Sequence, residues 1–327
     1  MRDVVSSPFA VELVGVDKRF GAFEAVRDVS LSVGKGEICV LIGPSGCGKT
    51  TTLKMINRVV PANGGTIRVR GEDIESLDPV RLRRSIGYVI QQVGLFPHMS
   101  VGANIALPLR LAGEGRARRR ARAAELLTLV GLSDALIDRH PAELSGGQQQ
   151  RVGVARALAA DPDIVLMDEP FGAVDPLLRP QLQSELKAIQ RRLGKTIILV
   201  THDLSEAFAL ADSIVLMDEG RVVQQASPRD LLLKPSGPFV QRFLQQVGAS
   251  EVVRLTEIAD LPRAPVDLSG PAMSVPASTT LAALLARFAA GEPLPARIDL
   301  VPAGKGPVAI AAVFDAIVAA IGRADPS

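Results

Sequence analysis

Hydrophobic and polar residues form two distinct patterns along the chain. Residues 10–20 and 26–33 alternate roughly between apolar and polar side chains, which is typical of an antiparallel sheet with one solvated face. Short, almost continuous apolar runs follow at residues 37–42, 164–167, 196–201 and 213–217. Such runs indicate buried strands, and helix-length segments separate the last three. The pattern therefore predicts an α/β fold, with a parallel sheet and crossover helices.

The pattern also divides the chain into parts. A helix is expected from Lys49 to about Arg58, and a Leu-, Ala- and Arg-rich helical stretch covers about residues 100–160. Near residue 245 the character changes, and Pro, Gly and small residues dominate residues 261–276. We therefore predict a main domain over residues 1–245, a linker over 246–272 and a small α/β unit over 273–327.

Composition narrows the possible functions. The 327 residues carry 37 Lys and Arg against 35 Asp and Glu, so the net charge gives no argument for a nucleic-acid partner. The only cysteines are Cys39 and Cys47, too few for a disulfide scaffold or a four-ligand zinc site. The sequence has no apolar run of about 18–20 residues and no signal-peptide pattern. We expect a cytoplasmic protein, and any membrane partner should be a separate chain.

A glycine-rich loop fits the pattern G-x-x-x-x-G-K-[ST], directly after a predicted strand and at the start of a predicted helix. The candidate nucleotide-binding residues here are Gly43, Pro44, Ser45, Gly46, Cys47, Gly48, Lys49, Thr50 and Thr51. Glycines let backbone N–H groups converge on phosphate oxygens, Lys49 neutralises the outer phosphates, and the Thr50 hydroxyl binds Mg²⁺. The alternative is a chance match to a short pattern.

Two consecutive carboxylates, Asp168 and Glu169, end the apolar run that begins at residue 164. Open α/β sheets bind ligands at the carboxyl ends of their strands, and side chains alternate along a strand, so the two carboxylates can have different roles. We expect Asp168 to hold the Mg²⁺ shell and Glu169 to accept a proton from the attacking water or to orient it. The alternative is a solvated acidic turn.

A third motif is more specific than the glycine-rich loop and the two carboxylates. Residues 144–158 read Leu-Ser-Gly-Gly-Gln-Gln-Gln-Arg-Val-Gly-Val-Ala-Arg-Ala-Leu, which resembles the signature motif of the ABC ATPases. Other positions match this family in the expected order. Gln91 resembles the glutamine of the Q-loop, Asp175 belongs to a segment that resembles the D-loop, and His202 resembles the switch histidine. Phe20 lies where the family places an aromatic ring against adenine. The resemblance covers about residues 10–245 and implies a P-loop NTPase cassette. Such a cassette has a parallel core sheet, an antiparallel β subdomain and a helical subdomain, here at about residues 92–160.

The resemblance implies ATP hydrolysis with Mg²⁺ as cofactor. The implied catalytic residues are Lys49, Gln91, Glu169 and His202, and the implied Mg²⁺ ligands are Thr50, Gln91 and Asp168. In the family two cassettes meet head to tail, so that the ATP held by one subunit is also bound by the other. The residues implied in this second contact are Ser145, Gly146, Gly147, Gln148 and Asp175. Pairing with an identical or a similar cassette is equally compatible with the sequence.

Residues 91–101 lie where the family's helical subdomain begins and faces the transmembrane subunits. Together with residues 54–58 and 70–74, they resemble ATPases of importers for quaternary amine osmoprotectants such as glycine betaine, carnitine or choline. This resemblance implies a permease and a substrate-binding protein as partners, no nucleic acid, and a place on the cytoplasmic face of the cell membrane. The alternatives are an importer for another solute class, such as amino acids or polyamines, and a soluble ABC ATPase outside transport.

Residues 273–327 resemble one copy of the CBS module, a nucleotide-binding regulatory unit that occurs in pairs in related importers. A single copy would pair with the tail of the dimer mate, because one half cannot easily bury its own sheet. The alternative is a degenerate remnant.

Two further features are an arginine cluster and a cysteine. The cluster consists of Arg116, Arg118, Arg119, Arg120 and Arg122. We interpret it as a solvated helix face, with binding to anionic lipid headgroups as the alternative. Cys47 lies at the start of a predicted helix, so we expect a stabilised thiolate whose alkylation blocks ATP binding.

Overall fold

The structure, a computed structural model, describes residues 8–91, 94–172, 174–245, 272–276, 278–289, 297–301 and 308–309. The chain divides into two compact units, Met1–Ser227 and Pro228–Ser327. Two helices that precede residue 245, α9 (Pro228–Leu233) and α10 (Pro238–Leu244), belong to the second unit. The domain boundary predicted at residue 245 stays a prediction.

The first unit begins with a four-stranded antiparallel sheet. Its strands, in spatial order, are β2 (Phe23–Gly34), β1 (Phe9–Phe20), β4 (Gly64–Val69) and β5 (Glu72–Asp73). Alternating burial along β1 and β2 agrees with the alternation of the sequence, because one face of the sheet packs on the core.

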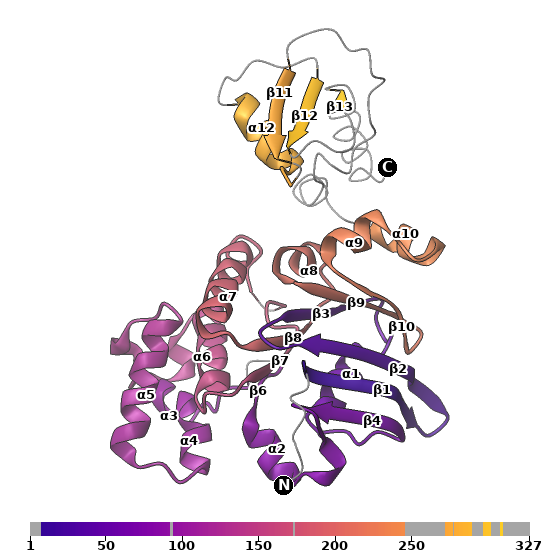
Figure 1. Cartoon of the computed structure of the whole chain (residues 1–327). Helices are drawn as coiled ribbons and strands as arrows, with labels where there is room; N and C mark the ends of the chain where they lie inside the picture. The colour runs from indigo at the N-terminus through magenta and orange to yellow at the C-terminus, as the bar shows by residue number, and fades with distance from the viewer. Residues whose placement is uncertain are drawn as a thin grey trace, which may run out of the picture. The chain divides into compact units, whose positions relative to one another are not determined.

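A six-stranded sheet forms the centre of the same unit (Figure 1). Its spatial order is β10 (Arg221–Ala226), β9 (Ser213–Asp218), β3 (Ile38–Ile42), β8 (Thr196–Val200), β7 (Ile164–Asp168) and β6 (Ile86–Val89). All neighbours run parallel except β9 and β10. Every residue of β3, β7 and β8 is buried, as their continuous apolar runs predict.

Helices cover this sheet and extend from its β6 edge. Beside the strands lie α1 (Lys49–Ile56), α2 (Pro79–Ser85), α7 (Arg179–Leu193), α8 (Leu204–Leu210) and the 3-10 turn Ile74–Ser76. The predicted helical stretch consists of α3 (Val101–Ile105), α4 (Leu107–Leu111), α5 (Arg116–Leu129) and α6 (Gly146–Leu158), with 3-10 turns at Asp134–Leu136 and Pro141–Glu143. We call α3 to α6 the helical lobe (Figure 1).

Local sequence explains where several helices begin and end. Side chains of Asp78, Ser100, Ser145 and Asp203 accept hydrogen bonds from the first turns of α2, α3, α6 and α8. The helix predicted from Lys49 to about Arg58 ends at Ile56. Arg58 has a φ of 48°, which is incompatible with a continuing helix.

One hydrophobic core joins the two sheets of the first unit. Its buried members include Val11 and Val29 from the antiparallel sheet, Leu53 from α1, and Leu166 and Ile198 from the central sheet. The helix that follows the glycine-rich loop is therefore packed between both sheets, which fixes its direction.

The second unit contains a small sheet with the order β11 (Ala272–Pro276), β12 (Arg297–Val301) and β13 (Val308–Ala309). The helix α12 (Leu281–Ala289) connects the parallel pair β11 and β12, and β13 runs antiparallel to β12. These elements are compatible with the small α/β unit expected there, while residues 310–327 lie outside the described part.

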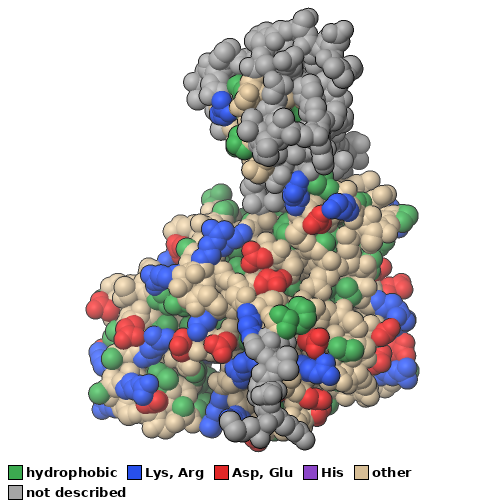
Figure 2. All heavy atoms as spheres, in the orientation of Figure 1, with side chains coloured by type: hydrophobic (Ala, Val, Ile, Leu, Met, Phe, Trp, Pro, Cys, Tyr) green, Lys and Arg blue, Asp and Glu red, His purple; other side chains and the backbone are tan. Residues whose placement is uncertain are grey.

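Lys and Arg side chains lie among Asp and Glu on the face of the molecule drawn in Figure 2, in agreement with the balanced charge. Among the residues described, no helix has the length and apolar character needed to cross a bilayer.

Candidate functional site

The glycine-rich loop connects β3 to α1 and depends on its glycines for its shape. Gly43, Gly46 and Gly48 have φ values of 144°, 80° and 101°, which L side chains rarely adopt. A Cβ at Gly43 would lie 2.0 Å from the carbonyl oxygen of Met217, and one at Gly48 would lie 2.5 Å from that of Ala25. Any side chain at these two positions would clash with backbone.

Lys49 is held inside this loop. Its side chain is buried, and Nζ donates hydrogen bonds to the carbonyl oxygens of Gly43 at 2.8 Å and Pro44 at 2.9 Å. The ammonium group is therefore fixed in the loop whose glycines leave room for a phosphate to approach the backbone. This geometry fits the outer phosphates of a nucleotide.

Cys47 differs from the expectation of a stabilised thiolate. The residue is 3% exposed, and burial raises the pKa of its thiol above the ordinary value. Lys49 Nζ lies 3.6 Å from Sγ and lowers the pKa, but less than burial raises it. The prediction was wrong because it weighed the positive helix end and left out the cost of removing a thiolate from water.

Thr50 and Asp168 meet although they are 118 positions apart in sequence. The Thr50 hydroxyl at the start of α1 donates a hydrogen bond of 2.8 Å to Asp168 Oδ1 at the end of β7. Burial raises the pKa of Asp168, while Thr50 and the nearby lysines Lys54 and Lys49 oppose this shift. A hydroxyl and a carboxylate beside a phosphate site are the oxygen ligands that Mg²⁺ prefers, so these residues fit the ion.

Glu169 lies between two polar side chains from neighbouring strand ends. Gln91 Nε2 donates a hydrogen bond of 2.9 Å to Glu169 Oε2, and His202 Nδ1 lies 3.3 Å from Glu169 Oε1. The φ of Glu169 is 46°, so the chain turns sharply at this residue after β7. The structure thus brings together three of the four predicted catalytic residues.

These side chains face a cavity of about 560 Å³. Its lining residues are Lys54, Tyr88, Ile90, Gln91, Asp168, Glu169, Gly172 and His202. Sequence reasoning missed Lys54 and Tyr88. Lys54 is four positions after Thr50 on α1, a spacing that places both on one helix face and was a usable signal. The buried Tyr88 hydroxyl has no hydrogen-bond partner among the described residues, and burial raises its pKa to about 12.

The signature residues form the exposed start of α6. The Gln148 backbone N–H donates to Ser145 Oγ at 3.3 Å, and the Ser145 backbone N–H donates to Gln148 Oε1 at 3.0 Å, a reciprocal capping box. Ser145 and Gly146 are exposed to solvent. Within the described residues, no hydrogen bond or ion pair joins this corner to the glycine-rich loop of the same chain. The contact of these residues with ATP stays a prediction.

Phe20 and Asp175 also lie at the surface. The Phe20 ring, at the end of β1, is half exposed, and Lys18 Nζ lies 5.0 Å from the ring centroid. Asp175 Oδ1 accepts a hydrogen bond of 2.8 Å from the Leu177 backbone, and Leu177 is 90% exposed. The contact of Phe20 with adenine stays a prediction, as does the contact of Asp175 with a partner subunit.

A buried polar network behind His202 was not predicted. Glu206 Oε2 accepts a hydrogen bond of 2.9 Å from the Thr201 hydroxyl, which itself accepts one of 3.0 Å from the Asp203 backbone. Asp203 lies 3.8 Å from Arg179, whose Nε donates to the Val174 carbonyl at 3.0 Å. The loop that carries His202 is therefore connected to the loop that precedes Asp175.

The sequence profile of the family described as ABC transporter matches residues 26–172. The chain is 52% identical over 268 residues to the glycine betaine uptake system ATP-binding protein YehX of Escherichia coli, covering 81% of this chain and 86% of that protein. It is 54% identical over 224 residues to the glycine betaine/carnitine/choline transport ATP-binding protein OpuCA of Bacillus subtilis, covering 68% of this chain and 59% of that protein.

Two further comparisons concern another transporter and a solved structure. The sulfate/thiosulfate import ATP-binding protein CysA of Bordetella parapertussis is 45% identical over 269 residues, which cover 78% of this chain and 75% of that protein. A dimeric ATP-binding cassette solved with ADP and phosphate superposes with a TM-score of 0.61 at 34% identity, covering 67% of this chain and 98% of the other. The predicted cassette fold and the predicted family are confirmed: the chain belongs to the ATP-binding subunits of ABC transporters.

Proposed function

We propose that this chain hydrolyses ATP with Glu169 as the group that accepts a proton from the attacking water. The observation that carries the proposal is the position of the Glu169 carboxylate, which Gln91 and His202 contact from two sides. These contacts orient the carboxylate towards the cavity that also contains Asp168. His202 positions Glu169 and contacts the γ-phosphate, while Lys49 neutralises the negative charge of the outer phosphates.

Thr50, Asp168 and Gln91 would hold Mg²⁺, which neutralises charge on the phosphates when it is bound. The Thr50–Asp168 hydrogen bond supports this assignment, because both oxygens already lie side by side. Phe20 would stack on the adenine ring, and Thr51, next to Thr50 in the first turn of α1, would contribute to nucleotide binding.

The second contact with ATP comes from another cassette. Support comes from the exposed Ser145–Gln148 corner and from the dimeric state of the solved cassette that superposes on this chain. Head-to-tail pairing would place Ser145, Gly146 and Gly147 of one subunit on the γ-phosphate held by the other, with Asp175 at the interface. Two identical chains suffice for this arrangement.

The test is Glu169→Gln, which keeps the shape of the side chain and removes the proton acceptor. We expect hydrolysis to fall by about 10²–10⁴-fold while MgATP binding persists and an ATP-dependent dimer accumulates. Hydrolysis is followed by phosphate release, and the dimer by size-exclusion chromatography with light scattering. Unchanged hydrolysis would show that another group accepts the proton.

The transported solute is a quaternary amine osmoprotectant such as glycine betaine, carnitine or choline, taken up through a separate permease with a substrate-binding protein. Support comes from relatives: those named for such solutes are 51–54% identical, whereas the sulfate/thiosulfate protein is 45% identical. The chain spans 56–66% of the length of several of the osmoprotectant relatives. It would act on the cytoplasmic face of the membrane.

Reconstitution with the partner permease in vesicles tests the solute. We expect a glycine betaine-loaded binding protein to stimulate ATP hydrolysis and solute uptake, with the Glu169→Gln chain as the inactive control. Stimulation only by a sulfate- or amino acid-binding protein would assign the chain to another importer.

Residues 273–327 act as a CBS-like regulatory module that pairs with its counterpart in the dimer mate. The support is its β11–α12–β12–β13 order and a small apolar core of Val275, Leu281, Leu284, Ile298 and Val308. Removing residues after about 250 should abolish the dependence of ATP hydrolysis on salt concentration. An unchanged salt response in the truncated protein would favour a remnant without regulatory function.

A further inference from the structure

The six arginines of α4 and α5 fall into two groups. Three of them hold a carboxylate: Arg118 with Glu114 at 3.1 Å, Arg120 with Asp138 at 2.8 Å and Arg122 with Glu125 at 3.1 Å. The other three, Arg110, Arg116 and Arg119, have no ion-pair partner in the part of the chain that the structure describes. The predicted solvated helix face is therefore only part of the explanation.

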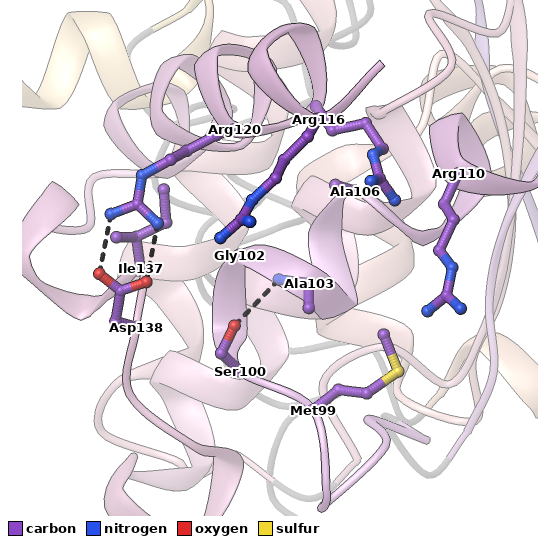
Figure 3. A pocket seen from close by; sticks show the side chains of 11 residues that line it. Met99, Ser100, Gly102, Ala103, Ala106, Arg110, Arg116, Arg120, Ile137 and Asp138 are labelled. Carbon is purple, nitrogen blue, oxygen red and sulfur yellow. Dashed lines mark hydrogen bonds and ion pairs between the residues drawn. The ribbon is translucent and has the colours of Figure 1, made fainter. Parts of the chain in front are cut away.

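The three unpaired arginines line one cavity of about 250 Å³ between α3, α4 and α5. In Figure 3 the guanidinium groups of Arg110 and Arg116 extend from their helices into this hollow, across from α3. The Nε of Arg119 is shielded from solvent and has no hydrogen-bond partner within the described residues. The cavity also contacts Ser100 and the apolar side chains of Met99, Ala103, Ala106 and Ile137.

The lining of this cavity is positively charged, because it contains four arginines and one carboxylate, that of Asp138. Three positive charges around one small space repel each other, and the first turn of α5 contains no acidic residue to compensate them. A guanidinium presents a planar set of N–H donors and forms its strongest hydrogen bonds with carboxylate or phosphate oxygens.

The number of arginines distinguishes between these two anions. At the rim of the cavity, Arg120 alone holds the Asp138 carboxylate through two hydrogen bonds of 2.8 Å. One arginine is thus enough for the two oxygens of a carboxylate, whereas three match a phosphate group, which presents more acceptor oxygens in several directions. The cavity is smaller than the roughly 300–1,000 Å³ of pockets for drug-sized ligands, which favours a small phosphate group over a whole nucleotide.

We propose that Arg110, Arg116 and Arg119 form a binding site for a phosphate monoester or phosphodiester group, separate from the nucleotide site. The phosphate comes from a soluble molecule or from an anionic lipid headgroup, and Ser100 adds a hydroxyl to the lining. This function goes beyond ATP hydrolysis and depends on residues outside the hydrolytic site.

The test measures phosphate binding to the full chain while its nucleotide site is occupied by a non-hydrolysable ATP analogue with Mg²⁺. The probes are inorganic phosphate, sn-glycerol 3-phosphate and vesicles with or without phosphatidylglycerol, compared by calorimetry and vesicle sedimentation. Succinate, a dicarboxylate, is the control ligand. Arg119→Gln and the double variant Arg110→Gln/Arg116→Gln remove the proposed donors. Arg118→Gln is the matched control, because it removes a charge from the same helix but outside the cavity.

We expect at least one probe to bind saturably, with affinity reduced at least about tenfold in Arg119→Gln and in the double variant but less than about twofold in Arg118→Gln. Binding of the soluble probes identifies a soluble ligand, and binding of phosphatidylglycerol vesicles alone identifies a lipid. Unchanged affinity for the ATP analogue shows that the variants are folded. The proposal is overturned if no probe binds, if Arg118→Gln loses as much affinity, or if succinate binds as tightly as the phosphates.

Discussion

Replacing Glu206 by Gln tests the energetic cost of a buried carboxylate next to the hydrolytic site. Glu206 is 5% exposed, and its Oε2 accepts a hydrogen bond from Thr201. Its Oε1 is buried without a hydrogen-bond partner among the residues described. Glutamine has the same shape and keeps an acceptor for Thr201, but it carries no charge at any pH. The variant is therefore a permanent equivalent of the protonated acid.

The size of the effect follows from the pKa of Glu206. It is raised from 4.5 to about 7, and burial is the largest cause; Asp203 and Glu169 add to the rise, and Thr201 and Arg179 oppose it. Since the pKa is higher in the folded than in the unfolded chain, the stabilising contribution is complete below about pH 4.5 and is lost as the pH rises through about 7. Each pKa unit corresponds to about 1.4 kcal/mol, so the free energy of unfolding should fall by about 3 kcal/mol over this range.

Urea denaturation of the wild-type chain and Glu206→Gln at pH 5 and pH 8 measures this effect. We expect similar stability near pH 5 and a variant that is more stable by about 3 kcal/mol at pH 8. Glu72→Gln, at an exposed position, should leave the difference between the two pH values unchanged. A Glu206→Gln chain that keeps the wild-type pH dependence, or is less stable at pH 8, would refute the reasoning.

Three further predictions concern single residues of the site. Ser145→Ala removes the side-chain cap of α6 and should lower the free energy of unfolding, measured by thermal or chemical denaturation, by about 1 kcal/mol. Equal stability of the variant and the wild type would mean that the hydrogen bond between Ser145 and Gln148 contributes nothing. Asp168→Asn keeps the shape of the side chain but removes a charge beside Thr50, so the Mg²⁺ concentration for half-maximal ATP hydrolysis should rise at least about tenfold. An unchanged Mg²⁺ requirement would argue against Asp168 as a ligand of the ion. Cys47 should react with N-ethylmaleimide at least about tenfold more slowly in the folded than in the urea-unfolded chain, because the thiol is buried and its pKa is raised. Mass spectrometry measures the modification, and equally fast reaction of the folded chain would contradict the prediction.

Most of the hydrolytic site was predictable because its residues belong to contiguous motifs. Asp168 ends a buried strand, Glu169 follows it, and His202 follows the next strand in the chain. The carboxyl ends of parallel strands meet at one edge of a sheet, so the encounter of Glu169 and His202 follows from the strand pattern, whereas Gln91 was identified by the resemblance to the family.

The features that sequence reasoning missed depend on burial or on distant contacts. The thiol of Cys47 and the carboxyl of Glu206 both have raised pKa values because their surroundings exclude water, and no local pattern reports this. Tyr88 lies on β6, a strand that is absent from the apolar runs identified in the sequence. Likewise, the ion pair that sets Arg120 apart from the unpaired arginines depends on Asp138, which lies 18 positions after it in the sequence.

The backbone at Glu169 carries an implication for engineering. Its φ of 46° is a conformation in which glycine is free of strain and a branched or long side chain is not. A selection for thermal stability alone would therefore favour glycine at this position, and if Glu169 is the proton acceptor as proposed, the selected proteins would no longer hydrolyse ATP. Screens for durable variants of this transporter subunit need turnover as a second criterion, since the two aims conflict at this single position.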